Sequence, residues 1–220
     1  MIKLIIFDYD GLLVESEIIA FLAEEKILKQ HGKILTKKLF NNYLGYSVRE
    51  TIQGYIKYYD LSINLNEFIL QRDEVINSLL SSHLSLKPGA KLLLNYLKDK
   101  NISMAIGSSG KRSYIEKGLA ILGISDYFNN ITSIDEVVRG KPHPDIFLKV
   151  LNKNHVESRD AIVLEDAVSG IQAAQDAHIF CIAIASSSID IQEYRIADLI
   201  VDNLQKVKEL LDQLQIIKKY

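Results

Sequence analysis

Short apolar runs recur along the chain, and each of them stops at a polar or glycine-rich turn. Their hydrophobicity is continuous rather than alternating, which is typical of strands buried on both faces of a parallel sheet. Helical patterns separate the later runs, so strand and helix alternate as in an open doubly wound sheet. The predicted strands are 2–7, 102–107, 130–134, 161–165, 180–185 and 198–201, and the predicted helices are 87–100, 113–123, 143–154, 167–178 and 203–219, the last with Asn203 as its N-cap.

The stretch from 15 to 86 interrupts this alternation, because its pattern predicts helices only. Within it, Asn64 and Glu67 form a predicted variant capping box, with Asn64 as the N-cap and Glu67 reaching back. One helical stripe follows, made of Leu65, Phe68, Ile69, Val75, Ile76, Leu79 and Leu80. We therefore predict an α/β protein with a doubly wound, mostly parallel, Rossmann-like core over 1–14 and 87–220. A helical cap domain is inserted over 15–86.

Composition and charge exclude several classes of protein. The 220 residues are 48% hydrophobic and 25% charged with a net charge of −2, which indicates a globular chain without a basic footprint for nucleic acid or anionic membranes. Cys181 is the only cysteine, so neither an intramolecular disulfide nor a cysteine-based zinc cluster can form. The start is too short and acidic for a signal peptide, and no apolar run reaches membrane-span length. A cytoplasmic protein is expected. It is also expected to be a monomer, because no interface signal stands out in the sequence.

Polar side chains gather where the predicted strands end. In open α/β sheets, ligands bind outside the carboxyl ends of the strands. The candidates at these ends are Asp8 and Asp10 after the first strand, Ser108, Ser109 and Gly110 after the second, Lys141 after the third, and Glu165 with Asp166 after the fourth. Four acids, one lysine and a hydroxyl would therefore converge at one edge of the sheet.

Such a concentration of acids requires a counter-charge. Four carboxylates beside a single lysine repel one another and raise one another's pKa values. A divalent cation removes the conflict, and oxygen-only donors without histidine or cysteine favour a hard ion, best Mg²⁺. Mg²⁺, a lysine, a serine hydroxyl and backbone N–H groups near Ser109 and Gly110 suit phosphoryl transfer, with an aspartate as nucleophile.

Four segments in order along the chain resemble the four motifs of the haloacid-dehalogenase-like hydrolases. They are FDYDGLLVES, IGSSG, GKPHPDIF and LEDAVSGIQAA, and the helical insert falls where that family carries its first-type cap. The similarity covers nearly the whole chain and is greatest to the β-phosphoglucomutase and phosphoglycolate-phosphatase-like branch. On its own, Asp-x-Asp-Gly would more often be a turn than a catalytic site; three further motifs in order favour the site.

The resemblance implies a role for each matching position. Asp8 attacks phosphorus and ligates Mg²⁺, while Asp10 serves as acid and then base and binds the metal through its backbone carbonyl. Ser108 and Lys141 hold the transferring phosphoryl group, and Lys141 also pairs with Asp8. The further predicted metal ligands are Asp166, directly, and Glu165, directly or through water, and the further predicted substrate-binding residues are Gly11, Ser109 and Gly110.

The resemblance also assigns substrate choice to the cap. The segment GYSVRE, 45–50, resembles the cap segment that approaches the substrate, so Gly45 and Arg49 are candidate specificity residues, although their spacing is one residue longer than in the mutase. Where the mutase has a histidine on its first cap helix, this chain has Ala20. Hydrolysis is therefore favoured over a mutase, which must protect its aspartyl-phosphate from water.

These observations predict a Mg²⁺-dependent phosphatase of a small phosphorylated metabolite, a sugar phosphate or similar monoester, acting through an aspartyl-phosphate. A β-phosphoglucomutase-type mutase would use the same residues and is the main alternative. A 2-haloacid dehalogenase shares the fold, but the second acid, Asp10, disfavours it. A non-enzymatic phosphoryl-accepting switch, like a response-regulator receiver, also combines acids, Mg²⁺, a hydroxyl and a lysine. The insert after the first strand and the spacing from Asp8 to Asp10 oppose that class.

Overall fold

The computed structural model describes residues 2–186 and 189–213, and the chain divides into two compact units. One unit is Met1–Glu15 together with Ser85–Tyr220, and the other is Ser16–Leu84. We call them the core unit and the helical unit. The chain thus leaves the core unit shortly after its first strand and returns to it before the second.

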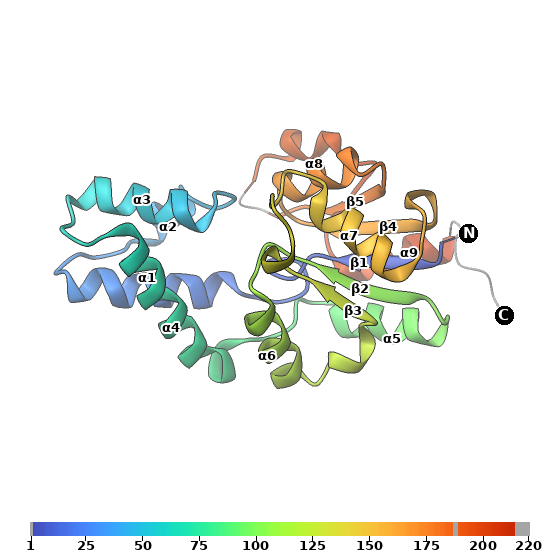
Figure 1. The fold of residues 1–220 in the computed structure, drawn as a ribbon, viewed down its shortest axis with the longest axis horizontal. Helices are drawn as coiled ribbons and strands as arrows, with labels where there is room; N and C mark the ends of the chain where they lie inside the picture. The colour runs from blue at the N-terminus through green and yellow to red at the C-terminus, as the bar shows by residue number, and fades with distance from the viewer. Residues whose placement is uncertain (1, 187–188, 214–220) are drawn as a thin grey trace. The chain divides into compact units, whose positions relative to one another are not determined.

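A six-stranded, wholly parallel sheet forms the middle of the core unit (Figure 1). Its order is β3-β2-β1-β4-β5-β6, so the chain winds outward from β1 in both directions. The strands are β1 (Leu4–Phe7), β2 (Ser103–Gly107), β3 (Asn130–Thr132), β4 (Ala161–Glu165), β5 (Phe180–Ile184) and β6 (Leu199–Val201). The six predicted strands and the α/β class are confirmed.

Helices cover both faces of this sheet. Leu4 and Ile6 of β1 share a buried cluster with residues of α7 and α8, while α5 and α6 lie on the opposite face (Figure 1). Because both faces are covered, all four residues of β1 are fully buried, which explains its continuous apolar sequence. The helices are α5 (Ala90–Asp99), α6 (Arg112–Leu122), α7 (Asp145–Asn154), α8 (Val168–Asp176) and α9 (Leu204–Gln213), with 3₁₀ turns η1 (Ser125–Tyr127), η2 (Ile134–Glu136), η3 (Ser158–Asp160) and η4 (Ile191–Ile196).

The last helix begins where the sequence predicts it. The Asn203 side chain accepts a hydrogen bond from the Lys206 N–H at 3.0 Å, which confirms the predicted N-cap. Residues 214–219 of the predicted helix lie outside the described residues. None of the helices in the described part is long and apolar enough to cross a membrane.

The register of the sheet places the carboxyl ends of β1, β2 and β4 side by side. Phe7 of β1 pairs with Ile106 of β2 on one side and with Leu164 of β4 on the other. The residues that follow these three therefore emerge at the same edge, where parallel strands present their carboxyl ends. Asp8 continues the pairing, because its N–H donates to the Leu164 carbonyl at 3.0 Å.

The helical unit consists of α1 (Glu17–Gln30), α2 (Lys37–Asn41), α3 (Val48–Tyr59) and α4 (Leu65–His83) around its own apolar cluster. A buried acid joins three of these helices. Glu24 of α1 accepts from Arg72 Nε of α4 at 2.8 Å and from the Tyr55 hydroxyl of α3 at 3.1 Å. Burial raises the pKa of Glu24, and both partners oppose this by favouring its charged form.

One helix start in this unit differs from its prediction, and a second helix start has a capping box that was not predicted. Asn64 does cap α4, but its side chain accepts from the Asn66 N–H at 2.8 Å, and the structure assigns no reciprocal bond from Glu67, so the predicted capping box is wrong. The capping box of this unit is at α3, where Ser47 and Glu50 bond each other's backbone N–H groups. Asn has a short side chain that closes a turn two residues on, and this local bond competes with the box.

Candidate active site

Three acids meet at the carboxyl ends of β1 and β4. Asp8 follows β1, Glu165 ends β4, and Asp166 is the next residue. One carboxylate oxygen from each lies within 4.8 Å of the others. Asp8 and Glu165 are buried and Asp166 is half-buried, so the three carboxyl groups face one another in a largely buried place. The predicted convergence of these three residues agrees with the geometry.

Lys141 inserts its ammonium between two of these acids. Its Nζ lies 2.5 Å from Asp8 Oδ1 and 2.5 Å from Glu165 Oε1, and its side chain is only 4% exposed. The Lys141 ammonium also lies 4.8 Å from the centre of the Phe147 ring, on the first turn of α7. The lysine is thus a fully enclosed counter-charge rather than a solvated surface residue.

Both carboxylate oxygens of Glu165 accept hydrogen bonds from the protein. Its Oε2 accepts from the backbone N–H groups of Asp166 and Ala167, each at 3.0 Å, while Oε1 faces Lys141. Gly170 on the first turn of α8 leaves the room for this carboxylate, because a Cβ at Gly170 would overlap it. Gly170 of the fourth motif therefore serves close packing against Glu165.

Gly11 is a glycine for two reasons. Its φ of 79° lies in the left-handed region that other residues rarely adopt. A Cβ at Gly11 would also overlap the Asp166 carboxylate. The turn after Asp10 consequently packs its bare backbone directly against an acid of the cluster. The structure shows this contact of Gly11 with Asp166. The substrate-binding role of Gly11 stays a prediction.

The electrostatics of the cluster follow from burial and crowding. Burial raises the pKa of Asp8 to about 8, with Lys141 opposing and Glu165 adding to the rise. Burial, together with the charges of Glu165 and Asp8, also raises the pKa of Asp166 well above its usual range. Burial lowers the pKa of Lys141, but the two neighbouring acids outweigh it and the net pKa is raised. The single charged lysine is therefore too little positive charge to keep Asp8 and Asp166 ionised in this buried place.

A divalent cation fits this imbalance. Among the described residues, Asp166 Oδ1 is a buried oxygen without a hydrogen-bond partner, and such an orphan is costly unless something binds it. The donors around it are carboxylate oxygens, which Mg²⁺ accepts together with water and substrate oxygens. The residues present therefore suit a bound Mg²⁺, with Asp8 and Asp166 as the acids able to hold it.

Asp10 lies beside the second motif rather than within the three-acid cluster. A Cβ placed on Gly110 would lie 3.4 Å from Asp10 Oδ2 and 3.3 Å from Ser108 Oγ, so these groups surround one small space. Ser108 is buried, and its Oγ accepts from the Gly110 N–H at 2.9 Å. Ser109 is exposed on the same turn. The structure thus brings Asp10 and the second motif together.

Sequence reasoning missed one residue at this place. The Tyr114 hydroxyl, on the first turn of α6, donates to Asp10 Oδ1 at 2.7 Å. Nothing in the IGSSGK segment marks a tyrosine six residues after Ser108 as part of the site. Only its position on the face of α6 that turns toward β1 brings the hydroxyl to the acid.

A salt-bridge network supports the segment that precedes Lys141. Glu136, the last residue of η2, pairs with Arg112 of α6 and Lys153 of α7. Burial would raise the pKa of Glu136, but hydrogen bonds from these two cations and from the Ser133 N–H lower it to about 2. The network ties η2, the start of the Lys141 loop, to both helices.

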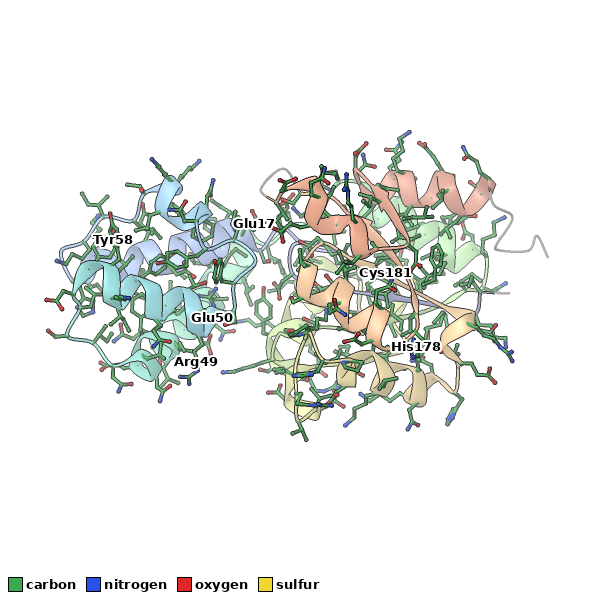
Figure 2. All side chains as sticks on the ribbon, turned by 90° about the horizontal axis from the view of Figure 1, so that it is seen from above. Glu17, Arg49, Glu50, Tyr58, His178 and Cys181 are labelled. Atoms are coloured by element: carbon green, nitrogen blue, oxygen red, sulfur yellow. The ribbon has the colours of Figure 1, made fainter. Side chains whose placement is uncertain are left out.

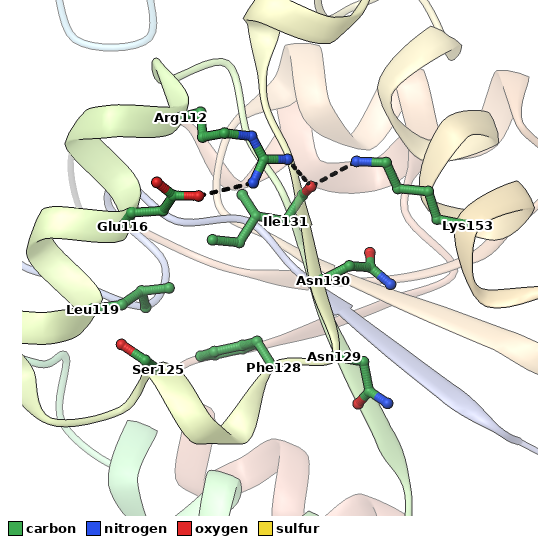
Figure 3. A pocket seen from close by; sticks show the side chains of 9 residues that line it. All are labelled: Arg112, Glu116, Leu119, Ser125, Phe128, Asn129, Asn130, Ile131 and Lys153. Atoms are coloured by element: carbon green, nitrogen blue, oxygen red, sulfur yellow. Dashed lines mark hydrogen bonds and ion pairs between the residues drawn. The ribbon is translucent and has the colours of Figure 1, made fainter.

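A hollow of about 590 Å³ lies beside the edge strand β3, and none of the acids described above lines it. Figure 3 shows Arg112 and Lys153 both directed at the Ile131 carbonyl, to which they donate at 2.6 and 2.7 Å. The two cations that line this hollow, Arg112 and Lys153, are therefore already bonded to the protein itself. Ligand chemistry is better supported at the strand ends than in this hollow.

The two candidate specificity residues belong to the helical unit. Gly45 has a φ of 85° in the turn before α3, and Arg49 is exposed on the first turn of that helix (Figure 2). Arg49 Nη2 donates to Asn66 Oδ1 of α4 at 3.1 Å. The arginine is thereby oriented by the neighbouring helix, and its role toward a substrate stays a prediction.

Comparisons with known proteins agree with the fold and the motifs. The sequence profile described as haloacid dehalogenase-like hydrolase matches residues 5–184. A phosphorylated carbohydrates phosphatase of Thermotoga maritima is 30% identical over 175 residues, which are 80% of this chain and 81% of that protein. A validoxylamine A 7'-phosphate phosphatase of Streptomyces hygroscopicus subsp. limoneus is 27% identical over 94% of this chain and 97% of its own.

Solved structures give the same result. A Thermotoga maritima protein with a provisional β-phosphoglucomutase name superposes with a TM-score of 0.83 at 27% identity, over 97% of this chain and all of that one. The profile match spans far more than half of the chain. The chain therefore belongs to the haloacid dehalogenase-like hydrolases, in their β-phosphoglucomutase and phosphoglycolate-phosphatase-like branch, and it is an enzyme of the phosphoric monoester hydrolase class.

Proposed function

We propose that this enzyme is a Mg²⁺-dependent phosphatase of small phosphorylated metabolites, a sugar phosphate or similar monoester, and that it works through an aspartyl-phosphate on Asp8. The single observation that carries the proposal is the buried cluster in which Lys141 joins Asp8 and Glu165 beside Asp166. The relatives named as phosphatases of phosphorylated carbohydrates and of validoxylamine A 7'-phosphate support this substrate class.

The proposed reaction has two displacement steps. First, an Asp8 oxygen forms a bond to phosphorus while the bond to the leaving alkoxide breaks, and Asp10 gives that oxygen its proton. Second, water attacks the aspartyl-phosphate, Asp10 takes a proton from the water, and phosphate and the free Asp8 carboxylate result. Asp10 returns to its protonated state, so protons and bonds balance over the cycle.

The remaining residues hold charge and orientation. Mg²⁺, when bound by Asp8, Asp166 and the Asp10 backbone carbonyl, would supply the positive charge that offsets the acids and the phosphoryl group. Lys141 and Ser108 hold the phosphoryl oxygens. Both Glu165 oxygens already accept hydrogen bonds from the protein, so we assign Glu165 to orienting Lys141 and to contacting the metal through water.

Substrate choice is assigned to the helical unit. Gly45 and Arg49 are proposed to contact the leaving group, and Gly11, Ser109 and Gly110 to contact the phosphoryl end of the substrate. The exposed guanidinium of Arg49 suits an anionic or hydroxyl-rich partner. We also propose that the enzyme is a cytoplasmic monomer, as the sequence leads us to expect. Light scattering tests the monomeric state.

Hydrolysis of p-nitrophenyl phosphate tests the proposal directly. We expect the purified protein to release p-nitrophenolate with Mg²⁺, and excess EDTA to abolish release because the acids then face one another with Lys141 alone. Adding Mg²⁺ beyond the chelator should restore it. Release that EDTA leaves unchanged would contradict the metal requirement. Stable phosphorylation without turnover would instead favour the phosphoryl-accepting switch.

A mutase is the second candidate, because a solved neighbour carries a provisional β-phosphoglucomutase name. With Ala20 in place of the mutase histidine, we expect β-glucose 1-phosphate, if it is accepted at all, to yield free phosphate rather than glucose 6-phosphate. Coupled assays for the two products measure the ratio. Glucose 6-phosphate in excess of phosphate would make the enzyme a mutase.

A further inference from the structure

We propose that Tyr114 is a positioning residue that orients the carboxylate of Asp10 for proton transfer to the leaving group. The inference rests on the proposed function, because it presumes that Asp10 is the acid and base. Its basis is the hydrogen bond from the Tyr114 hydroxyl to Asp10 Oδ1 at 2.7 Å, which joins residues 104 positions apart in the chain.

The tyrosine ring is itself fixed by its surroundings. It meets the ring of Tyr9 edge to face, with centroids 5.6 Å apart and planes at 90°. Tyr9 stands between Asp8 and Asp10 in the sequence and is completely buried. Tyr114 lies on the first turn of α6, where its N–H donates to the Lys111 carbonyl at 3.1 Å. Its hydroxyl therefore has a defined place relative to the catalytic turn.

The hydrogen bond from Tyr114 gives the two carboxylate oxygens of Asp10 different surroundings. Oδ1 accepts from the phenol, which settles the plane of the carboxylate, and Oδ2 then lies on the side of Gly110. The bare backbone of Gly110 and the buried Ser108 hydroxyl border the same space. Oδ2 is thus the oxygen that faces the phosphoryl-holding motif, and we assign proton transfer to it. A misplaced proton donor costs rate steeply, since catalysis requires near-attack geometry.

A leaving-group comparison separates this role from a merely structural one. Tyr114→Phe keeps the ring against Tyr9 and removes only the donor. We expect kcat/KM to fall about 10- to 100-fold for an alkyl phosphate that the wild type hydrolyses, such as glucose 6-phosphate, because an alkoxide must be protonated as it leaves. For p-nitrophenyl phosphate we expect less than about a 3-fold change, because p-nitrophenolate leaves without a proton.

Tyr96→Phe is the matched control. The Tyr96 hydroxyl also donates to a carboxylate of the core unit, Asp212, at 2.8 Å, but it lies on α5 in an exposed pair. We expect this variant to leave both kcat/KM values and their ratio unchanged. Melting temperatures of the two variants within a few degrees of the wild type would show that the core packing is retained.

A double-mutant cycle adds a second measurement. If Tyr114 acts through Asp10, then Tyr114→Phe lowers activity toward the alkyl phosphate in the wild type but adds no further loss in Asp10→Asn. Equal losses for both substrates, or additive losses in the double variant, would overturn the positioning role. Wild-type activity in Tyr114→Phe would do the same while leaving the proposed function intact. A wild type that hydrolyses no phosphate ester removes the proposed function and the inference with it.

Discussion

Asp8→Asn is expected to lower p-nitrophenyl phosphate turnover by a factor on the order of 10³ or more, because the amide cannot form the aspartyl-phosphate. The change is nearly isosteric, and Lys141 keeps its second partner, Glu165. Steady-state rates with saturating Mg²⁺ measure the effect, and a phosphate-trapping assay should detect no phosphorylated protein.

The stability of the same variant provides its control. Asp8 contributes one of three crowded acids, so the variant is expected to fold, and to melt at or above the wild-type temperature without Mg²⁺. It should gain less from added Mg²⁺ than the wild type, because it has lost a ligand. Undiminished turnover in a folded Asp8→Asn protein would show that Asp8 is not the nucleophile.

Lys141→Met is expected to lower the free energy of unfolding by about 3 to 5 kcal/mol without Mg²⁺, the range for a buried ion pair that loses one partner. It should also abolish turnover. The lysine is 4% exposed and is the cation between Asp8 and Glu165 at 2.5 Å from each. Urea unfolding at pH 7 measures the loss, and added Mg²⁺ should recover part of it.

The pH dependence of this variant has a defined sign. Lys141 lowers the pKa of Asp8 and Asp166, so its removal raises both folded-state values further above those of the unfolded chain. A carboxyl whose pKa is raised by folding stabilises the protein only while it is protonated. The difference in the free energy of unfolding between the wild type and Lys141→Met should therefore grow as pH rises from 6 toward 9.

Lys3→Met is the control for Lys141→Met. Lys3 also pairs with an acid, Asp160, at 2.6 Å, but its side chain is 63% exposed. Exposed pairs contribute about 0 to 1 kcal/mol, so this variant should unfold nearly as the wild type does. If the two lysine variants lose equal stability, Lys141 is not the enclosed counter-charge described above.

Much of this enzyme follows from sequence pattern alone. Continuous apolar runs such as LIIF mark strands covered on both faces, and the six strands appear where the pattern places them. Parallel strands present their carboxyl ends at one edge, so acids that directly follow β1 and end β4 must meet there. The meeting of Asp8, Glu165 and Asp166 therefore required no knowledge of side-chain packing.

Helix ends were predicted less evenly, for a physical reason. Asn203 caps α9 as its position indicates, whereas Asn64 caps α4 through a bond two residues on, without the reciprocal Glu67. The helical unit has its capping box at α3, between Ser47 and Glu50, in the same segment as Gly45 and Arg49. Cap residues have several local bonds of similar free energy available, and small packing differences select among them.

Sequence by itself determined the strands, the helical insert and the acids at the strand ends, because these follow from periodicity and from the geometry of a parallel sheet. Only the tertiary structure decided that Tyr114 donates to Asp10 and that bare glycines at 11 and 170 admit the carboxylates of Asp166 and Glu165. Such contacts join residues far apart in the chain through particular side-chain rotamers, and helix packing rather than local pattern selects those.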